Sequence, residues 1–169
     1  MTTARRKKKE NIVEYLLYMW QVEDMIRACG LDMNVIETKI ISQYSQSEEV
    51  MTETCQWYSD LCNMMRSEGV TERGHIQIIK NDMAELVELH LSLLKNPQET
   101  LYGSLYYKAL PAIVQLRSKS GGVEQSEIET CITAVYGYLL LKMQSREISA
   151  ETDESIRTIS AMLAFLAAK

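Results

Sequence analysis

The strongest constraint on the fold of this chain is the spacing of its apolar residues, which recur every three to four positions along most of its 169 residues. This period matches the 3.6 residues per turn of an α-helix, and no segment shows the alternation of a half-buried strand. Capping residues, Gly and Pro divide the pattern into segments. We expect seven helices, over about residues 9–29, 35–44, 47–68, 72–95, 97–119, 127–146 and 150–168.

The clearest helix start is the one at Asn96. Asn96 can cap the helix, Pro97 can take the first helical position, where its missing N–H costs nothing, and Glu99 can reach back to the cap. Pro111 lies inside the same predicted helix and should kink or split it. Because the links between predicted helices are short, neighbouring helices should pack antiparallel.

Length and charge set the domain organisation. A chain of 169 residues predicts one domain, which can bury roughly 70% of the surface that its unfolded form exposes. The net charge is −5, although the chain begins with a basic run, so the remainder is acidic. We expect a basic tail over residues 1–8 and a single helical bundle over residues 9–169. An acidic body argues against nucleic-acid binding, except through the basic run of Arg5, Arg6, Lys7, Lys8 and Lys9.

Cysteine usage and hydropathy predict the compartment. None of the four cysteines forms a C-x-x-C pair, which favours free thiols in a reducing compartment. The apolar run over residues 15–20 is far shorter than the about 20 residues that a membrane span needs. We therefore expect a cytoplasmic protein that does not enter a membrane.

The first predicted helix is apolar on nearly every side, which is typical of a helix at the centre of a bundle. Glu23, Asp24 and Arg27 nevertheless project from one of its apolar arcs. A buried charge without a partner is costly, so these groups need compensation. One interpretation is a structural ion pair between Glu23 and Arg27. The other is a polar pocket that binds a small ligand, with His90 as a further member, because His90 lies among apolar neighbours on the fourth predicted helix.

Motifs for catalysis or metal binding are scarce. The chain has one Glu-x-x-His, at Glu72 and His75, whereas di-iron bundles need two such motifs. Glycine-rich phosphate loops and the G-x-S-x-G motif are absent from the sequence. The sequence therefore gives no catalytic residue, metal ligand or cofactor, and it favours a protein that is not an enzyme.

The aromatic composition points to a protein interface. The chain has 9 Tyr but a single Phe, and Tyr102, Tyr106 and Tyr107 cluster on the fifth predicted helix. Tyrosine combines an apolar body with a polar tip, which suits surfaces that are buried only on assembly. These three residues are candidates for an interface with a protein partner or another copy of the chain; alternatively, they fill the rim of the core.

The first predicted helix also resembles a known family. Residues 8–12, 14–24 and 26–27 (KKENI, EYLLYMWQVED and IR) are similar to the opening of an uncharacterised family of helical proteins from Bacteroidetes. The resemblance implies a single domain of about this length in a bacterial cytoplasm. It implies no activity, cofactor or site residue.

Three functions remain open from the sequence. The first is a non-enzymatic interaction or assembly protein that associates with itself. The alternative is a bundle that binds or converts a small molecule around Glu23, Asp24, Arg27 and His90. A second alternative is a nucleic-acid accessory protein that acts through the basic N-terminus.

Overall fold

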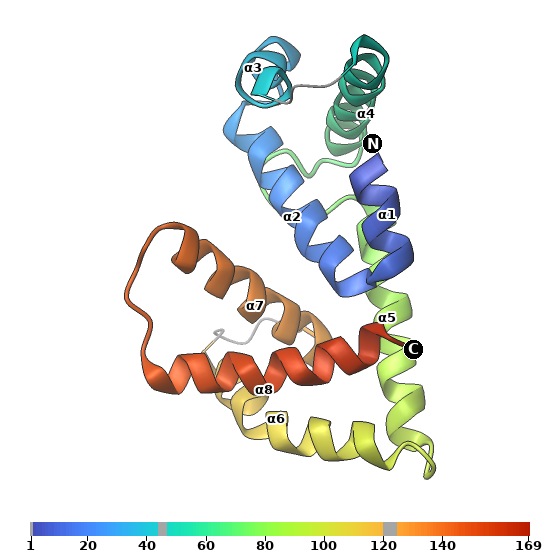
Figure 1. Ribbon diagram of the computed structural model, residues 1–169, viewed down its shortest axis with the longest axis vertical. Coiled ribbons are helices and arrows are strands. Elements are labelled where there is room, and N and C mark those ends of the chain that lie inside the picture. Colours follow the sequence, from blue (N-terminus) through green and yellow to red (C-terminus); the bar gives the residue numbers. More distant parts are fainter. Residues whose placement is uncertain (1, 44–46, 120–124) are drawn as a thin grey trace. The chain divides into compact units, whose positions relative to one another are not determined.

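The computed structural model describes residues 2–43, 47–119 and 125–169 (Figure 1). All regular structure within these ranges is helical, which confirms the predicted all-α class. The structure has α1 (Thr2–Glu10), α2 (Ile12–Ala28), α3 (Met33–Lys39), the short 3₁₀ helix η1 (Ile41–Gln43), α4 (Glu48–Ser67), α5 (Gln77–Lys95), α6 (Thr100–Lys119), α7 (Glu127–Met143) and α8 (Ala150–Ala167).

This all-α domain is divided into two compact units. The first unit spans Met1–Asp82 and the second spans Met83–Lys169, so the boundary falls inside α5. Helices α1 to α4 build the first unit, and α6 to α8 build the second. The expected single bundle is therefore organised as two smaller cores.

The basic N-terminus is a helix, which corrects the expectation of a tail over residues 1–8. Asn11 separates α1 from α2: its backbone is extended, and its side chain accepts a hydrogen bond from the N–H of Glu14 at 3.0 Å. Ala4 is buried, and Lys8 donates to both carboxylate oxygens of Asp82 at 2.7 and 2.8 Å. The packing of Ala4 and this ion pair therefore hold α1 in place, although the charge of the segment had suggested a solvated tail.

Helix α2 is central to the first unit. It contributes more buried side chains than any other helix there, and Leu16, Val22 and Ile26 are fully enclosed. The helix ends as its sequence predicts: Gly30 has a positive φ of 63°, and the N–H of Leu31 donates to the carbonyl of Ile26 at 3.0 Å. This turn is the usual way in which glycine terminates a helix.

The start of α5 differs from the prediction. The periodicity placed it near residue 72, but the helix begins at Gln77, and residues 70–76 form a loop. Gly74 has a φ of 87°, outside the helical region, so the loop turns sharply there. This loop becomes important below, because charged side chains of α2 hold it.

The second unit is built around α6 and α8, which lie side by side, with α7 packed against both (Figure 1). Its core is formed mainly by Tyr102, Ala109, Ile113, Ile128, Cys131, Ile132, Ile159, Met162 and Leu166. Helix α6 continues through Pro111, so the proline does not split it. Asn96 caps a turn, accepting from the N–H of Gln98 at 3.0 Å, and the helix proper begins at Thr100.

The structure also bears on the membrane. Among the residues that it describes, no helix has both the length and the apolar character needed to cross a bilayer.

Candidate functional site

Glu23 is the most deeply buried charged group of the first unit. Its side chain is fully enclosed, and Oε1 accepts a hydrogen bond from the N–H of Ile76 at 2.9 Å. Its other oxygen lies 2.5 Å from Nδ1 of His75, whose ring stacks on the indole of Trp20 with centroids 4.4 Å apart. The predicted burial of Glu23 is confirmed, but its predicted pairing with Arg27 is wrong.

Arg27 holds the loop over residues 70–76 from the same helix. Its side chain is 15% exposed and forms an ion pair with Asp24 at 2.9 Å. It also donates to the carbonyl of Val70 at 3.2 Å and to that of Gly74. Glu23 and Arg27 thus hold one loop at two points: Glu23 accepts from the N–H of Ile76, and Arg27 donates to two loop carbonyls. This arrangement anchors a loop, and of the polar atoms of these two side chains only the buried Nε of Arg27 has no hydrogen-bond partner among the described residues.

His90 belongs to the second unit, and its partners are there. Its Nδ1 lies 2.6 Å from the hydroxyl of Tyr102, and its Nε2 lies 3.6 Å from a carboxylate oxygen of Glu127. Burial lowers the pKa of His90, and the neighbouring Glu127 opposes this shift. Glu23, Asp24 and Arg27 have their partners in the first unit. Neither unit therefore contains the predicted pocket of all four residues.

The buried thiol of Cys131, near Glu127 and Tyr102, is not activated. Burial and the nearby Glu127 raise the pKa of Cys131 to about 12. A thiol with such a pKa stays protonated at neutral pH and is a poor nucleophile. The cluster around His90 is thus unsuited to thiolate chemistry.

The three candidate interface tyrosines of α6 have different surroundings. Tyr102 is fully buried against His90, which excludes it from an interface and corrects that prediction. Tyr106 is half-buried, whereas Tyr107 is 69% exposed. Successive positions on a helix point about 100° apart, so neighbouring tyrosines reach different surroundings.

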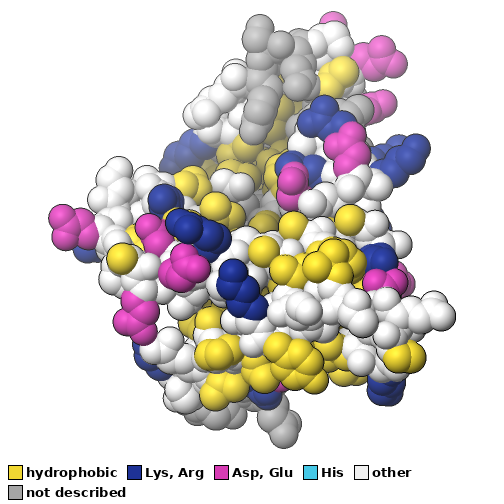
Figure 2. Space-filling model, turned by 60° about the horizontal axis from the view of Figure 1, so that its bottom comes forward, with side chains coloured by type: hydrophobic (Ala, Val, Ile, Leu, Met, Phe, Trp, Pro, Cys, Tyr) yellow, Lys and Arg dark blue, Asp and Glu magenta, His cyan; other side chains and the backbone are white. Residues whose placement is uncertain are grey.

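Tyr107 belongs to a line of small and apolar residues along α6. Gly103, Tyr107, Leu110 and Val114 follow one another at intervals of four, three and four, and we call this line the α6 seam. Tyr107 and Val114 are 69% and 59% exposed, and a Cβ added at Gly103 would meet no atom within 4 Å. Hydrophobic side chains gather on the face of the molecule that is drawn in Figure 2. The α6 seam thus offers apolar contact surface with space above its glycine.

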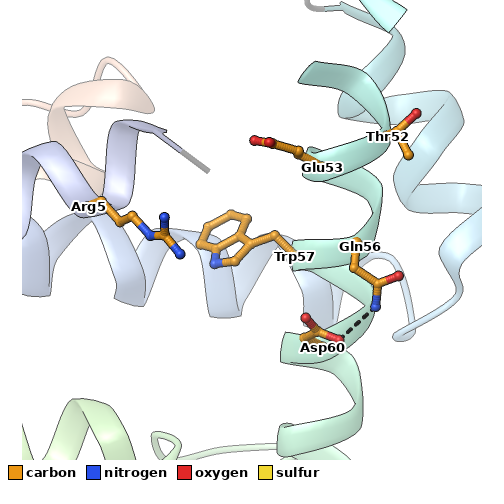
Figure 3. A pocket seen from close by; sticks show the side chains of 6 residues that line it. All are labelled: Arg5, Thr52, Glu53, Gln56, Trp57 and Asp60. Atoms are coloured by element: carbon orange, nitrogen blue, oxygen red, sulfur yellow. Dashed lines mark hydrogen bonds between the residues drawn. The ribbon is translucent and has the colours of Figure 1, made fainter. Parts of the chain in front are cut away.

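A groove between α1 and α4 escaped the sequence reasoning. It has a volume of about 420 Å³ and lies within the first unit (Figure 3). Its lining residues are Arg5, Thr52, Glu53, Gln56, Trp57 and Asp60. The available signal was the spacing of Glu53, Trp57 and Asp60, which places them on one face of α4. Arg5 gave no signal, because its segment was interpreted as a tail.

A metal ion needs several ligand side chains close together. Within the described ranges, no three His, Cys, Asp or Glu side chains lie close enough together to hold a metal ion. The single Glu-x-x-His therefore lacks further metal ligands in these ranges, and His75 instead lies against the carboxylate of Glu23.

Comparison with known proteins identifies a family and no activity. A family model described as a domain of unknown function (DUF4924) matches residues 1–169, which confirms the predicted resemblance to an uncharacterised family. The bacterial origin that the resemblance implies stays a prediction. No curated protein matches the chain significantly. No solved structure does so either.

Proposed function

The chain belongs to the DUF4924 family of unknown function, and we propose that it is a non-enzymatic assembly protein that pairs with a second copy of itself through the α6 seam. The observation that carries this proposal is the exposure of Tyr107 and Val114 on one line of the helix. Large apolar side chains in such a line favour helix–helix contact, because pairing removes them from water.

The spacing of the α6 seam suits an antiparallel pair. Intervals of four and three are those of residues that face a partner helix in a coiled coil. A register that sets Gly103 against Val114 of the second copy also sets Tyr107 against Leu110 of the second copy. Each large side chain then meets a smaller one, and the two-fold axis makes both halves of the contact identical.

Charge at the end of α6 favours this orientation. The last turn carries Arg117 and Lys119, and a parallel pair would bring these basic ends together. An antiparallel pair keeps them apart and opposes the two helix dipoles. Glu99, which precedes the helix, is paired with Lys169 of the same chain at 2.7 Å and is not needed for this preference.

The buried polar groups support a role without catalysis. The carboxylate of Glu23 is occupied by the chain's own donors, and Arg27 by its own acceptors. The basic run that suggested nucleic-acid binding is also partly neutralised: Lys7 pairs with Glu14 at 3.0 Å and Lys8 with Asp82 at 2.7 Å. These contacts favour the assembly role over both alternative functions.

We infer a cytoplasmic setting for this assembly. The four cysteines are free thiols, and two of them, Cys62 and Cys131, are buried. Free thiols persist in the reducing compartments of the cell.

Two matched substitutions on α6 test the proposal. Val114 and Leu101 are both 59% exposed, but only Val114 lies on the α6 seam. Light scattering coupled to size-exclusion chromatography should show a dimer for the wild type and for Leu101→Glu, and a monomer for Val114→Glu. Circular dichroism checks that both variants keep their helix content. A monomeric wild type at high micromolar concentration, or an equal effect of both substitutions, would refute the proposal.

A further inference from the structure

The groove between α1 and α4 places an indole between two carboxylates. Glu53 and Asp60 lie four residues before and three residues after Trp57, so all three share a face of α4 (Figure 3). The indole is only partly buried, and its edge-on contact with Tyr58 leaves it among the groove-lining residues. The face of an indole attracts cations, and flanking carboxylates strengthen that attraction.

The carboxylates of the groove are not neutralised by their own chain. Glu53 forms no hydrogen bond or ion pair with any residue that the structure describes. Asp60 accepts a hydrogen bond from the neutral amide of Gln56 at 2.8 Å, which orients it and leaves its charge in place. This wall of the groove therefore has an open capacity for positive charge.

The opposite wall carries the opposite charge. Arg5, from α1, extends its guanidinium toward Trp57 across the groove (Figure 3). It forms no ion pair within 4 Å with a described carboxylate, in contrast to Arg6, which lies 3.9 Å from Glu10. A guanidinium is the side chain best suited to binding a carboxylate with two parallel hydrogen bonds.

From these two walls we propose that the groove binds a small zwitterion, with its ammonium group over Trp57 between Glu53 and Asp60 and its carboxylate at Arg5. The groove has a volume of about 420 Å³, which is room for a small ligand, and it is open to solvent, since five of its six lining residues are exposed. A simple cation would leave Arg5 unused, and a simple anion would be repelled by the two carboxylates. The groove lies in the first unit, so the proposal does not depend on the α6 seam.

The tryptophans provide a direct readout. The chain has 2 Trp, so the indole N–H region of a nitrogen–proton correlation spectrum holds two signals, and Trp57→Phe identifies that of Trp57. Titration with a short and a long trimethylammonium carboxylate, glycine betaine and γ-butyrobetaine, should shift the Trp57 signal saturably for at least one probe. The signal of Trp20, stacked on His75, should stay in place.

Ligands that carry only one of the two charges, and variants of the groove, sharpen the test. Tetramethylammonium and acetate should each bind at least about tenfold more weakly than the better zwitterion, since each uses one wall only. Glu53→Gln and Arg5→Gln should each weaken the zwitterion by a similar factor, whereas Arg6→Gln, the matched control on α1, should not. The proposal is overturned if neither zwitterion moves the Trp57 signal at millimolar concentration, if tetramethylammonium binds as well as the zwitterions, or if Arg5→Gln and Arg6→Gln behave alike.

Discussion

The two units differ in where their charged and their large apolar side chains lie. In the first unit, two charged side chains turn inward and pair within the chain: Glu23 with His75 and a backbone N–H, and Arg27 with Asp24 and two carbonyls. In the second unit, large apolar side chains stay on the surface. Those of α6 and α7 are Leu101, Tyr107, Val114, Leu139, Leu141 and Met143.

Buried charges and exposed apolar side chains have different energetic requirements. A buried charge must find a partner within the fold, because desolvation without one costs several kcal/mol. An exposed apolar side chain has no such requirement, and it gains free energy only when another surface covers it. The charged cluster of the first unit therefore helps to hold its fold, and the apolar surface of the second unit is the basis of the proposed self-association.

The largest expected effect is on the first unit. Glu23→Ala should lower the free energy of unfolding by about 3 kcal/mol, because it leaves the N–H of Ile76 and the ring of His75 without their acceptor. Urea denaturation measures this change. Asp24→Ala is the control: its side chain is 51% exposed, so its loss should cost less than about 1 kcal/mol. Equal losses in the two variants would contradict the contrast between buried and exposed carboxylates.

A smaller effect is expected at Arg27. Arg27→Lys keeps the positive charge beside Asp24. A lysine ammonium lacks the planar guanidinium that reaches both loop carbonyls, so the free energy of unfolding should fall by about 1 to 2 kcal/mol. Arg157→Lys is the control, because Arg157 is 76% exposed and pairs with Glu154 on its own helix. If both substitutions prove neutral, the loop over residues 70–76 does not depend on Arg27.

The smallest expected effect is a pH dependence in the second unit. Burial lowers the pKa of His90 from its ordinary value of 6.5, so the unfolded chain takes up a proton more readily than the folded one. Stability should therefore fall as the pH drops through 6.5, and His90→Gln should remove part of that fall. Denaturation at several pH values measures it. His75→Gln, in the first unit, should retain the contribution of His90; identical slopes for the wild type and His90→Gln would rule out this contribution.

The sequence predicted where the helices lie better than it predicted which residues contact one another. The end of α2 at Gly30 followed from local chemistry, and so did the burial of Glu23, because its neighbours along the helix are apolar. The partner of Glu23 did not follow, since His75 lies 52 residues further along the chain. The start of α5 was misplaced, because residues 72–76 fit a helical period while Arg27 and the turn at Gly74 hold them as a loop.

The same limit applies to the candidate sites. Tyr102, Tyr106 and Tyr107 look alike in the sequence, but only the packing of α6 decides that Tyr102 is enclosed and Tyr107 exposed. The groove was beyond prediction, because Arg5 reaches it from a segment that looked like a solvated tail. The basic run suggested a tail there, whereas in the structure Ala4 is buried and Lys8 pairs with Asp82.

By itself, the sequence determined the all-α class, most helix ends and the burial of Glu23, although it missed the buried Asp82 and did not separate Glu23 from the exposed Asp24. These features depend on interactions between residues within a few turns of one another, and their pattern is written in the order of the residues. Only the tertiary structure decided which loop Glu23 and Arg27 hold, that there are two cores, and which side chains line the groove and the α6 seam. These depend on contacts between distant segments, whose free energy arises only when the helices pack.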